Sequence, residues 1–150
     1  MHIAAHLQKI SRLQRSRARL DAAADFEMWF WAAMQAGTHA LNAALHHAGL
    51  TRQSDAFAMQ PGVYLVPQQD GLLAPQLLPP GDVLHLGRPK IEGELPADIQ
   101  RIAHAMEVIE GYRDPCVRQG RPATPQIAAE CDAALQECLS VLRQRLGDLG

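Results

Sequence analysis

Apolar side chains recur every three or four positions in four stretches of the chain, which is the period of an amphipathic α helix. These stretches predict helices over about 3–20, 22–48, 96–112 and 125–146. The second stretch is apolar on nearly every side and contains no proline, so we expect it to be the central, most buried helix. In the fourth, Thr124 is a candidate N-cap and Pro125 suits the first turn. The pattern therefore predicts a mainly α fold, a four-helix bundle that forms one domain over residues 1–150.

Two glycines and one aspartate bear on the limits and the packing of the second predicted helix. Gly49 follows the helix directly and suits the left-handed position beyond a helix C-terminus. Gly37 lies inside the helix, where glycine costs about 1 kcal/mol relative to alanine, so we expect a close helix crossing there to offset this cost. Neither proline nor glycine separates the first two helices, so they could also form one long rod bent near Asp21.

The segment 50–95 differs in composition, because it holds six of the ten prolines and five glycines. A structureless loop of this length is unusual inside a compact domain, so we expect internal order. Apolar runs at 63–66 and 72–74 flank an Asp-Gly turn signal and predict a β hairpin. A third strand at 82–86 and a helical turn at about 55–59 are further predictions. The segment thus reads as a proline-rich, partly β insertion between the second and third helices.

Composition and charge narrow the class of protein. The chain has 150 residues, 47% of them hydrophobic, and a net charge of −2, as expected of one globular domain. Residues 1–20 carry five cations and no acid, so the first helix could contact phosphate or an acidic partner, or could be a solvated face. Three cysteines, no signal-peptide pattern and no long apolar run predict a cytoplasmic protein without a membrane partner.

A line of uncharged polar side chains follows one face of the second predicted helix. Four of them are spaced by four, three and four residues, and a tryptophan lies one turn earlier. Such a line suits a small-molecule or nucleotide ligand, although a solvent-facing edge or contact with the proline-rich segment would give the same pattern. A plain solvent face usually carries Lys, Glu or Arg, which are missing here. With one arginine of the stretch 87–90 as an anion contact, the predicted ligand-binding residues are Trp31, Gln35, His39, Asn42, His46 and Arg88.

The sequence lacks the motifs of common catalytic and metal sites. Seven histidines suggest a metal site, but there is no His-Glu-x-x-His and no Glu-x-x-His. A Gly-x-Ser-x-Gly elbow and a glycine-rich phosphate loop are also missing. Cys131 and Cys138 lie on the apolar face of the fourth helix, where cysteine usually acts as a small hydrophobe. We therefore expect no catalytic residue, metal ligand or cofactor, and favour a protein that is not an enzyme.

The second predicted helix, which runs from Asp25-Phe26 through His39 to Asn42-Ala43 and His46, resembles HEPN-type helical bundles. In that family a long early helix often carries an Asn-Ala pair near a histidine. The resemblance covers mainly residues 22–48 and implies a dimer. Many members are ribonucleases or partner a nucleotidyltransferase. Ribonuclease members carry an arginine followed by a histidine after four to six residues, whereas only two residues separate Arg101 from His104. The proline-rich insertion is also atypical.

These observations favour a homodimeric binding or interaction module with a small-molecule or nucleotide pocket along the second helix. The first alternative is an atypical HEPN-like nuclease that acts on RNA through the basic first helix, with His39 or His46 as general acid or base. The second alternative is a bundle that binds a metal ion through its histidines. Four of the seven aromatic residues lie within 26–31, and we expect most of them in the core.

Overall fold

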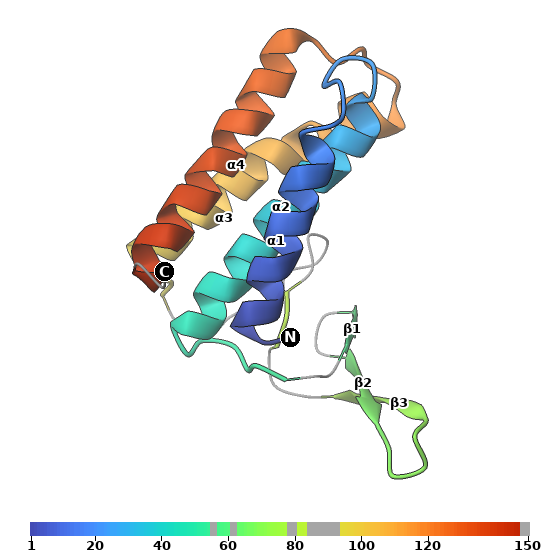
Figure 1. Cartoon of the computed structure of the whole chain (residues 1–150), viewed down its shortest axis with the longest axis vertical. Helices are drawn as coiled ribbons and strands as arrows, with labels where there is room; N and C mark the ends of the chain where they lie inside the picture. Colours follow the sequence, from blue (N-terminus) through green and yellow to red (C-terminus); the bar gives the residue numbers. More distant parts are fainter. Residues whose placement is uncertain (55–56, 61–62, 78–80, 84–93, 148–150) are drawn as a thin grey trace.

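The computed structural model describes residues 1–54, 57–60, 63–77, 81–83 and 94–147. Within these ranges the chain forms a small antiparallel sheet and four α helices, α1 (Ile3–Arg17), α2 (Phe26–His47), α3 (Ala97–Gly111) and α4 (Pro125–Leu146). Figure 1 shows the helices lying side by side and the sheet standing off one end of the bundle, near the N-terminus. The predicted mainly α fold with a partly β insertion is confirmed. None of the helices in these ranges has the length and apolar character needed to cross a bilayer.

A turn at Asp21 separates α1 from α2 and reverses the chain. The Asp21 carboxylate accepts hydrogen bonds from the backbone N–H groups of Ala23 and Ala24, at 2.8 and 2.9 Å. Such side-chain bonds compete with helical hydrogen bonds. These bonds keep Ala23 and Ala24 out of α2, which begins at Phe26, whereas α1 ends at Arg17. The predicted limits at 20 and 22 are therefore wrong by three and four residues. The alternative of one bent rod is also wrong, since α1 and α2 run antiparallel (Figure 1).

The helix α2 is the core of the bundle, as predicted, because it contacts each of the other three helices. Its side chains Phe30, Ala33 and Met34 are fully buried. A Cβ atom at Gly37 would lie 2.1 Å from Met106 Sδ on α3, which confirms the predicted close crossing. Gly49 has a φ of +72°, the left-handed conformation expected beyond the helix end.

Helices α3 and α4 complete the core, and α4 holds two of the three cysteines. The N-terminus of α4 is capped as predicted, because Thr124 Oγ1 accepts a hydrogen bond from the N–H of Ile127 at 3.2 Å. Both helices match their predicted limits to within one residue, and a single π-helical turn, η1 (Arg113–Arg118), follows α3. Cys131 and Cys138 are fully buried on α4, as expected for cysteines on its apolar face.

The sheet has the strand order β1-β2-β3, with both neighbouring pairs antiparallel. Its strands are β1 (Phe57–Gln60), β2 (Val63–Pro67) and β3 (Leu73–Leu77). The hairpin of β2 and β3 confirms the prediction, with Gly71 at a φ of +81° in the connecting turn. The helical turn predicted at 55–59 is wrong where the structure describes it, because 57–60 pairs with β2.

The strand predicted at 82–86 is also wrong at its first two residues. Asp82 and Val83 are not in a strand, and 84–86 lie outside the described residues. The backbone N–H and C=O of Val83 bond to the side chain of Asn42 on α2 instead of to a neighbouring strand. The segment 81–83 is therefore held against the helical bundle.

Candidate metal centre

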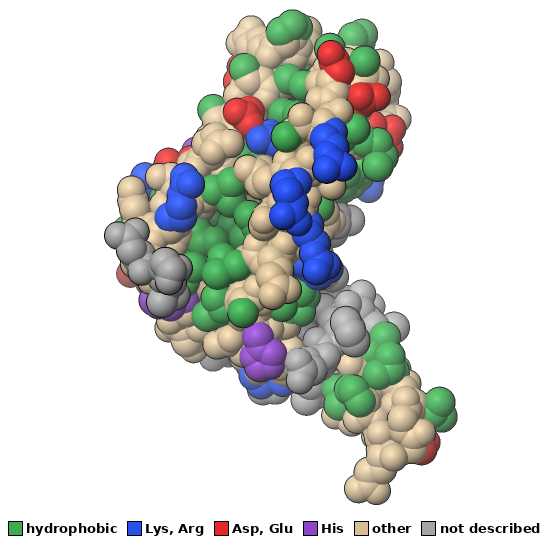
Figure 2. Space-filling view, viewed as in Figure 1, with side chains coloured by type: hydrophobic (Ala, Val, Ile, Leu, Met, Phe, Trp, Pro, Cys, Tyr) green, Lys and Arg blue, Asp and Glu red, His purple; other side chains and the backbone are tan. Residues whose placement is uncertain are grey.

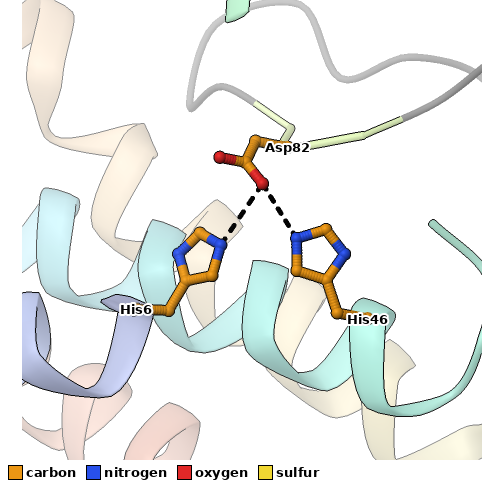
Figure 3. A group of neighbouring side chains, drawn as sticks. All are labelled: His6, His46 and Asp82. Atoms are coloured by element: carbon orange, nitrogen blue, oxygen red, sulfur yellow. Dashed lines mark hydrogen bonds and ion pairs between the residues drawn. The ribbon is translucent and has the colours of Figure 1, made fainter. Parts of the chain in front are cut away.

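Two histidines and an aspartate from three separate parts of the chain meet at one end of the bundle. His6 lies in the first two turns of α1, and His46 lies in the last turn of α2. Because the two helices are antiparallel, these positions lie at the same end of the bundle. Asp82 reaches them from the segment 81–83, and Figure 3 shows both imidazole rings directed at its carboxylate.

A single carboxylate oxygen is the meeting point of these groups. Asp82 Oδ1 lies 2.8 Å from His46 Nε2 and 3.3 Å from His6 Nε2. The amino group of Met1 lies 2.7 Å from the same oxygen. One candidate ligand atom from each of the three side chains lies within 4.8 Å of the others. The rings of His6 and His46 are buried, and Asp82 is half-buried.

The second nitrogen of each imidazole has a partner of its own. His46 Nδ1 lies 2.7 Å from Thr51 Oγ1, and His6 Nδ1 lies 2.9 Å from His39 Nδ1. An ionised carboxylate only accepts hydrogen bonds, so both Nε2–H groups donate to Asp82 when the rings are neutral. The Nδ1 atoms then accept from the hydroxyl and from the neighbouring imidazole. Every ring nitrogen that faces the cluster is thus satisfied in one consistent set of tautomers.

The position of Asp82 is set by an amide clamp on the next residue. Asn42 Oδ1 accepts from the Val83 N–H at 2.6 Å, and Asn42 Nδ2 donates to the Val83 carbonyl at 2.8 Å. The same Nδ2 group donates to the Thr38 carbonyl at 3.1 Å. Asn42 and Val83 are each 2% exposed, so these bonds are shielded from water. The clamp fixes the backbone that carries the Asp82 carboxylate.

Burial and the three hydrogen bonds set the charge state of the cluster. Burial lowers the pKa of His6, although the hydrogen bond and charge of Asp82 act in the opposite direction. Burial, the nearby His6 and the Lys9 ammonium lower the pKa of His39 to about 4. Burial alone would raise the pKa of Asp82, but the hydrogen bonds from His46, His6 and the N-terminus bring it well below its usual range. At neutral pH the cluster therefore pairs an ionised carboxylate with neutral His6 and His39 rings.

The structure divides the predicted polar line of α2 into two parts. Gln35 and His39 line a cavity together with residues of α1. Asn42 and His46 instead contact the segment 81–83, as in the alternative interpretation of contact with the proline-rich segment. The line is therefore covered by α1 and by this segment.

The two remaining predicted ligand residues lie apart from the cluster or outside the described chain. Trp31 is half-buried and packs edge-on against Phe30, with ring centroids 5.5 Å apart and planes at 76°. Arg88 lies outside the described residues. The pair Arg101 and His104 is exposed on α3, where Arg101 bonds to Glu137 on α4.

The sequence-based prediction missed His6, Thr51 and Asp82. His6 carried a signal, because it lies among the apolar positions of the first helix rather than among its cations. Asp82 and Thr51 carried none, since nothing in their neighbourhood shows that they face a histidine. Among the residues that the structure describes, His6, His46 and Asp82 are the one group of three His, Cys, Asp or Glu side chains placed to share an ion.

No protein-family model, curated protein or solved structure matches the chain. Any statement about function therefore depends on the chemistry of the residues themselves.

Proposed function

We propose that this chain is a metal-binding helical bundle in which His6, His46 and Asp82 hold one divalent transition-metal ion. The observation that carries the proposal is the convergence of two buried Nε2 atoms on one carboxylate oxygen, at 2.8 and 3.3 Å. Two ligand atoms about 2.1 Å from an ion and roughly 90–110° apart are separated by about 3.0–3.4 Å. The separation of His6 Nε2 from Asp82 Oδ1 lies within this range, that of His46 Nε2 lies just below it, and the three candidate ligand atoms all lie within 4.8 Å of one another.

The partners behind the ligands support the same interpretation. When an ion takes Nε2, the ring proton must move to Nδ1, and the group facing Nδ1 must then accept a hydrogen bond. Thr51 Oγ1 and His39 Nδ1 can each either donate or accept. Both groups that face the Nδ1 atoms can therefore follow the change from the proton-bearing to the ion-binding tautomers.

The set of ligands indicates the class of ion. Two imidazoles and one carboxylate suit zinc, iron(II) or similar first-row ions, whereas calcium and magnesium prefer oxygen ligands alone. Three protein ligands leave at least one coordination position for water or another molecule. An ion bound in this way supplies Lewis acidity and can lower the pKa of a bound water.

Metal titration of the whole chain tests the proposal. The protein carries a histidine-free tag at its C-terminus, is stripped with EDTA, and is titrated with Zn²⁺ by calorimetry and with Co²⁺ by absorption spectroscopy. We expect one ion per chain. His46→Ala and Asp82→Asn should weaken binding about tenfold or more, since partners behind a ligand alone contribute that much. His47→Ala is the matched control, because His47 is the next residue and is exposed.

The outcomes distinguish a specific metal site from nonspecific binding of the ion to histidines. Equal losses in His46→Ala and His47→Ala, or no stoichiometric ion in the unaltered chain, would contradict the proposal. Thermal unfolding shows whether a variant has lost metal binding only because it no longer folds. An ion at about 100 times its Kd for the unaltered chain should stabilise that chain by about 2.7 kcal/mol and should stabilise a folded Asp82→Asn variant by about 1.4 kcal/mol or less.

The homodimer, the cytoplasmic location, the nucleotide ligand and the HEPN-like nuclease stay predictions of the sequence. Size-exclusion chromatography at micromolar concentration tests the dimer. RNA binding at low salt tests the nuclease, because phosphate contacts are strongest there.

A further inference from the structure

A cavity of about 280 Å³ lies between α1 and α2, next to the proposed metal centre. Its lining residues are Lys9, Arg12 and Leu13 of α1 and Gln35 and His39 of α2. His39 connects the two sites, because its Nδ1 atom lies 2.9 Å from His6 Nδ1. The cavity is therefore separated from the candidate metal ligand His6 by a single imidazole ring.

The two cations of this cavity have no carboxylate partner in the part of the chain that the structure describes. Arg17, farther along α1, pairs with Asp132 of α4 at 2.6 Å. Among the residues that the structure describes, neither Lys9 nor Arg12 forms such a pair. Figure 2 shows lysine and arginine side chains gathered in a row over α1. The cavity thus brings together two positive charges that no acid of the described chain neutralises.

We infer that this cavity binds a small anionic molecule through a carboxylate or phosphate group. Arg12 offers a planar fork of donors that matches either group, and Lys9 adds a second positive charge. The Gln35 amide supplies a further polar contact, and Leu13 supplies an apolar wall. A volume of about 280 Å³ is at the lower end for small-molecule sites, which favours a ligand of few atoms. This inference does not depend on the metal ion.

The shape of the site favours a small anion over a nucleic acid. A polyanion would use the whole basic row of residues 1–20. Lys9, Arg12, Arg15 and Arg19 are all exposed, but only Lys9 and Arg12 line the cavity. A small anion would contact Lys9 and Arg12 and leave the other two arginines in solvent. The pair Lys9 and Arg12 and the pair Arg15 and Arg19 each carry two positive charges, and all four lie on α1 except Arg19, which follows it. Each pair is therefore the control for the other.

Titrations with inorganic phosphate and with succinate, each against a chloride baseline, test the inference in EDTA-treated protein. Binding is followed by ¹H–¹⁵N NMR, where the side-chain amide of Gln35 reports directly on the cavity. We expect saturable binding with a Kd of about 1 mM or tighter for at least one probe. Lys9→Gln/Arg12→Gln should weaken it about tenfold or more, because bonds to charged groups are lost. Arg15→Gln/Arg19→Gln should change it less than about twofold, apart from weak long-range electrostatics.

Each outcome decides between the alternatives. Tighter binding of phosphate or of succinate assigns the ligand class and supports the inference. Equal losses in the two double variants would overturn it in favour of a diffuse polyanion surface, and the absence of saturable binding would overturn it outright. Asp82→Asn separates the two proposals, because a folded variant that loses the metal ion should still bind the anion.

Discussion

Asn42→Ala is the substitution that best tests how the fold positions the candidate metal centre. Among the described residues Asn42 forms no hydrogen bond with either imidazole of the cluster, but it holds both backbone polar groups of Val83, the residue that follows Asp82. If the clamp positions the carboxylate, its loss should weaken metal binding while every proposed ligand is still present. We expect metal affinity to fall about 10–100-fold, the range for partners that orient a ligand.

The cost in stability follows from the bonds that are lost. Asn42→Ala leaves the N–H and C=O of Val83 without their partner at a site that is 2% exposed. Each unsatisfied buried group costs about 1–3 kcal/mol. Some of this cost is recovered if water enters or if the segment 81–83 moves toward solvent. We therefore expect the free energy of unfolding, measured by urea denaturation in EDTA, to fall by about 2–4 kcal/mol.

Thr38→Val is the matched control on the same helix, one turn before Asn42. Thr38 is buried, and its hydroxyl donates to the Met34 carbonyl at 2.9 Å, within α2 itself. Losing this bond should cost about 1 kcal/mol and leave metal affinity unchanged. Calorimetric titration with Zn²⁺ measures the affinities of both folded variants. Equal affinities of Asn42→Ala and the unaltered chain, or an equal loss in Thr38→Val, would refute the positioning argument.

Two further predictions test the packing of the core. Gly37→Ala should destabilise the fold by about 1–3 kcal/mol, since the added Cβ would lie 2.1 Å from Met106 Sδ. In a Met106→Ala background the same change should stabilise by up to about 1 kcal/mol through helix propensity, and an equal loss in both backgrounds in urea unfolding would contradict the crossing. Burial raises the pKa of Cys131 to about 12, which leaves its thiol protonated at neutral pH. Mass spectrometry after iodoacetamide treatment of the native chain should therefore find label on half-buried Cys116 but not on Cys131 or Cys138, and equal labelling of all three would refute their burial.

The helices and the hairpin could be predicted because their signals are local. Thr124 and Pro125 mark the start of α4 directly, and the Asp-Gly turn marks the hairpin. The start of α2 could not be predicted as well, because Asp21 bonds to the backbone two and three residues later and removes those residues from the helix. Propensity and periodicity alone do not show which side chain will compete with a helical turn.

The candidate metal centre could not be predicted in this way, since each of its three side chains comes from a different part of the chain. His46 and Asp82 are 36 positions apart, and His6 and Asp82 are 76 positions apart. Metal motifs combine ligands at fixed short spacings on one helix or loop, and no such spacing is present here. The contact of His6 with Asp82 depends on the antiparallel packing of α1 on α2 and on the amide clamp at Val83, which are properties of the assembled fold.

The uncharged character of the polar line on α2 has a physical explanation in this arrangement. A charged side chain buried between α2 and its neighbours would need a partner or lose much of its hydration free energy. Imidazole and amide groups can be buried there because each forms hydrogen bonds, as Asn42 does with Val83 and His46 with Asp82 and Thr51. The charges missing from this face of α2 are supplied by α1 and by the segment 81–83. In this chain the neutral polar line therefore faces α1 and the segment 81–83, and these elements bring the charged groups.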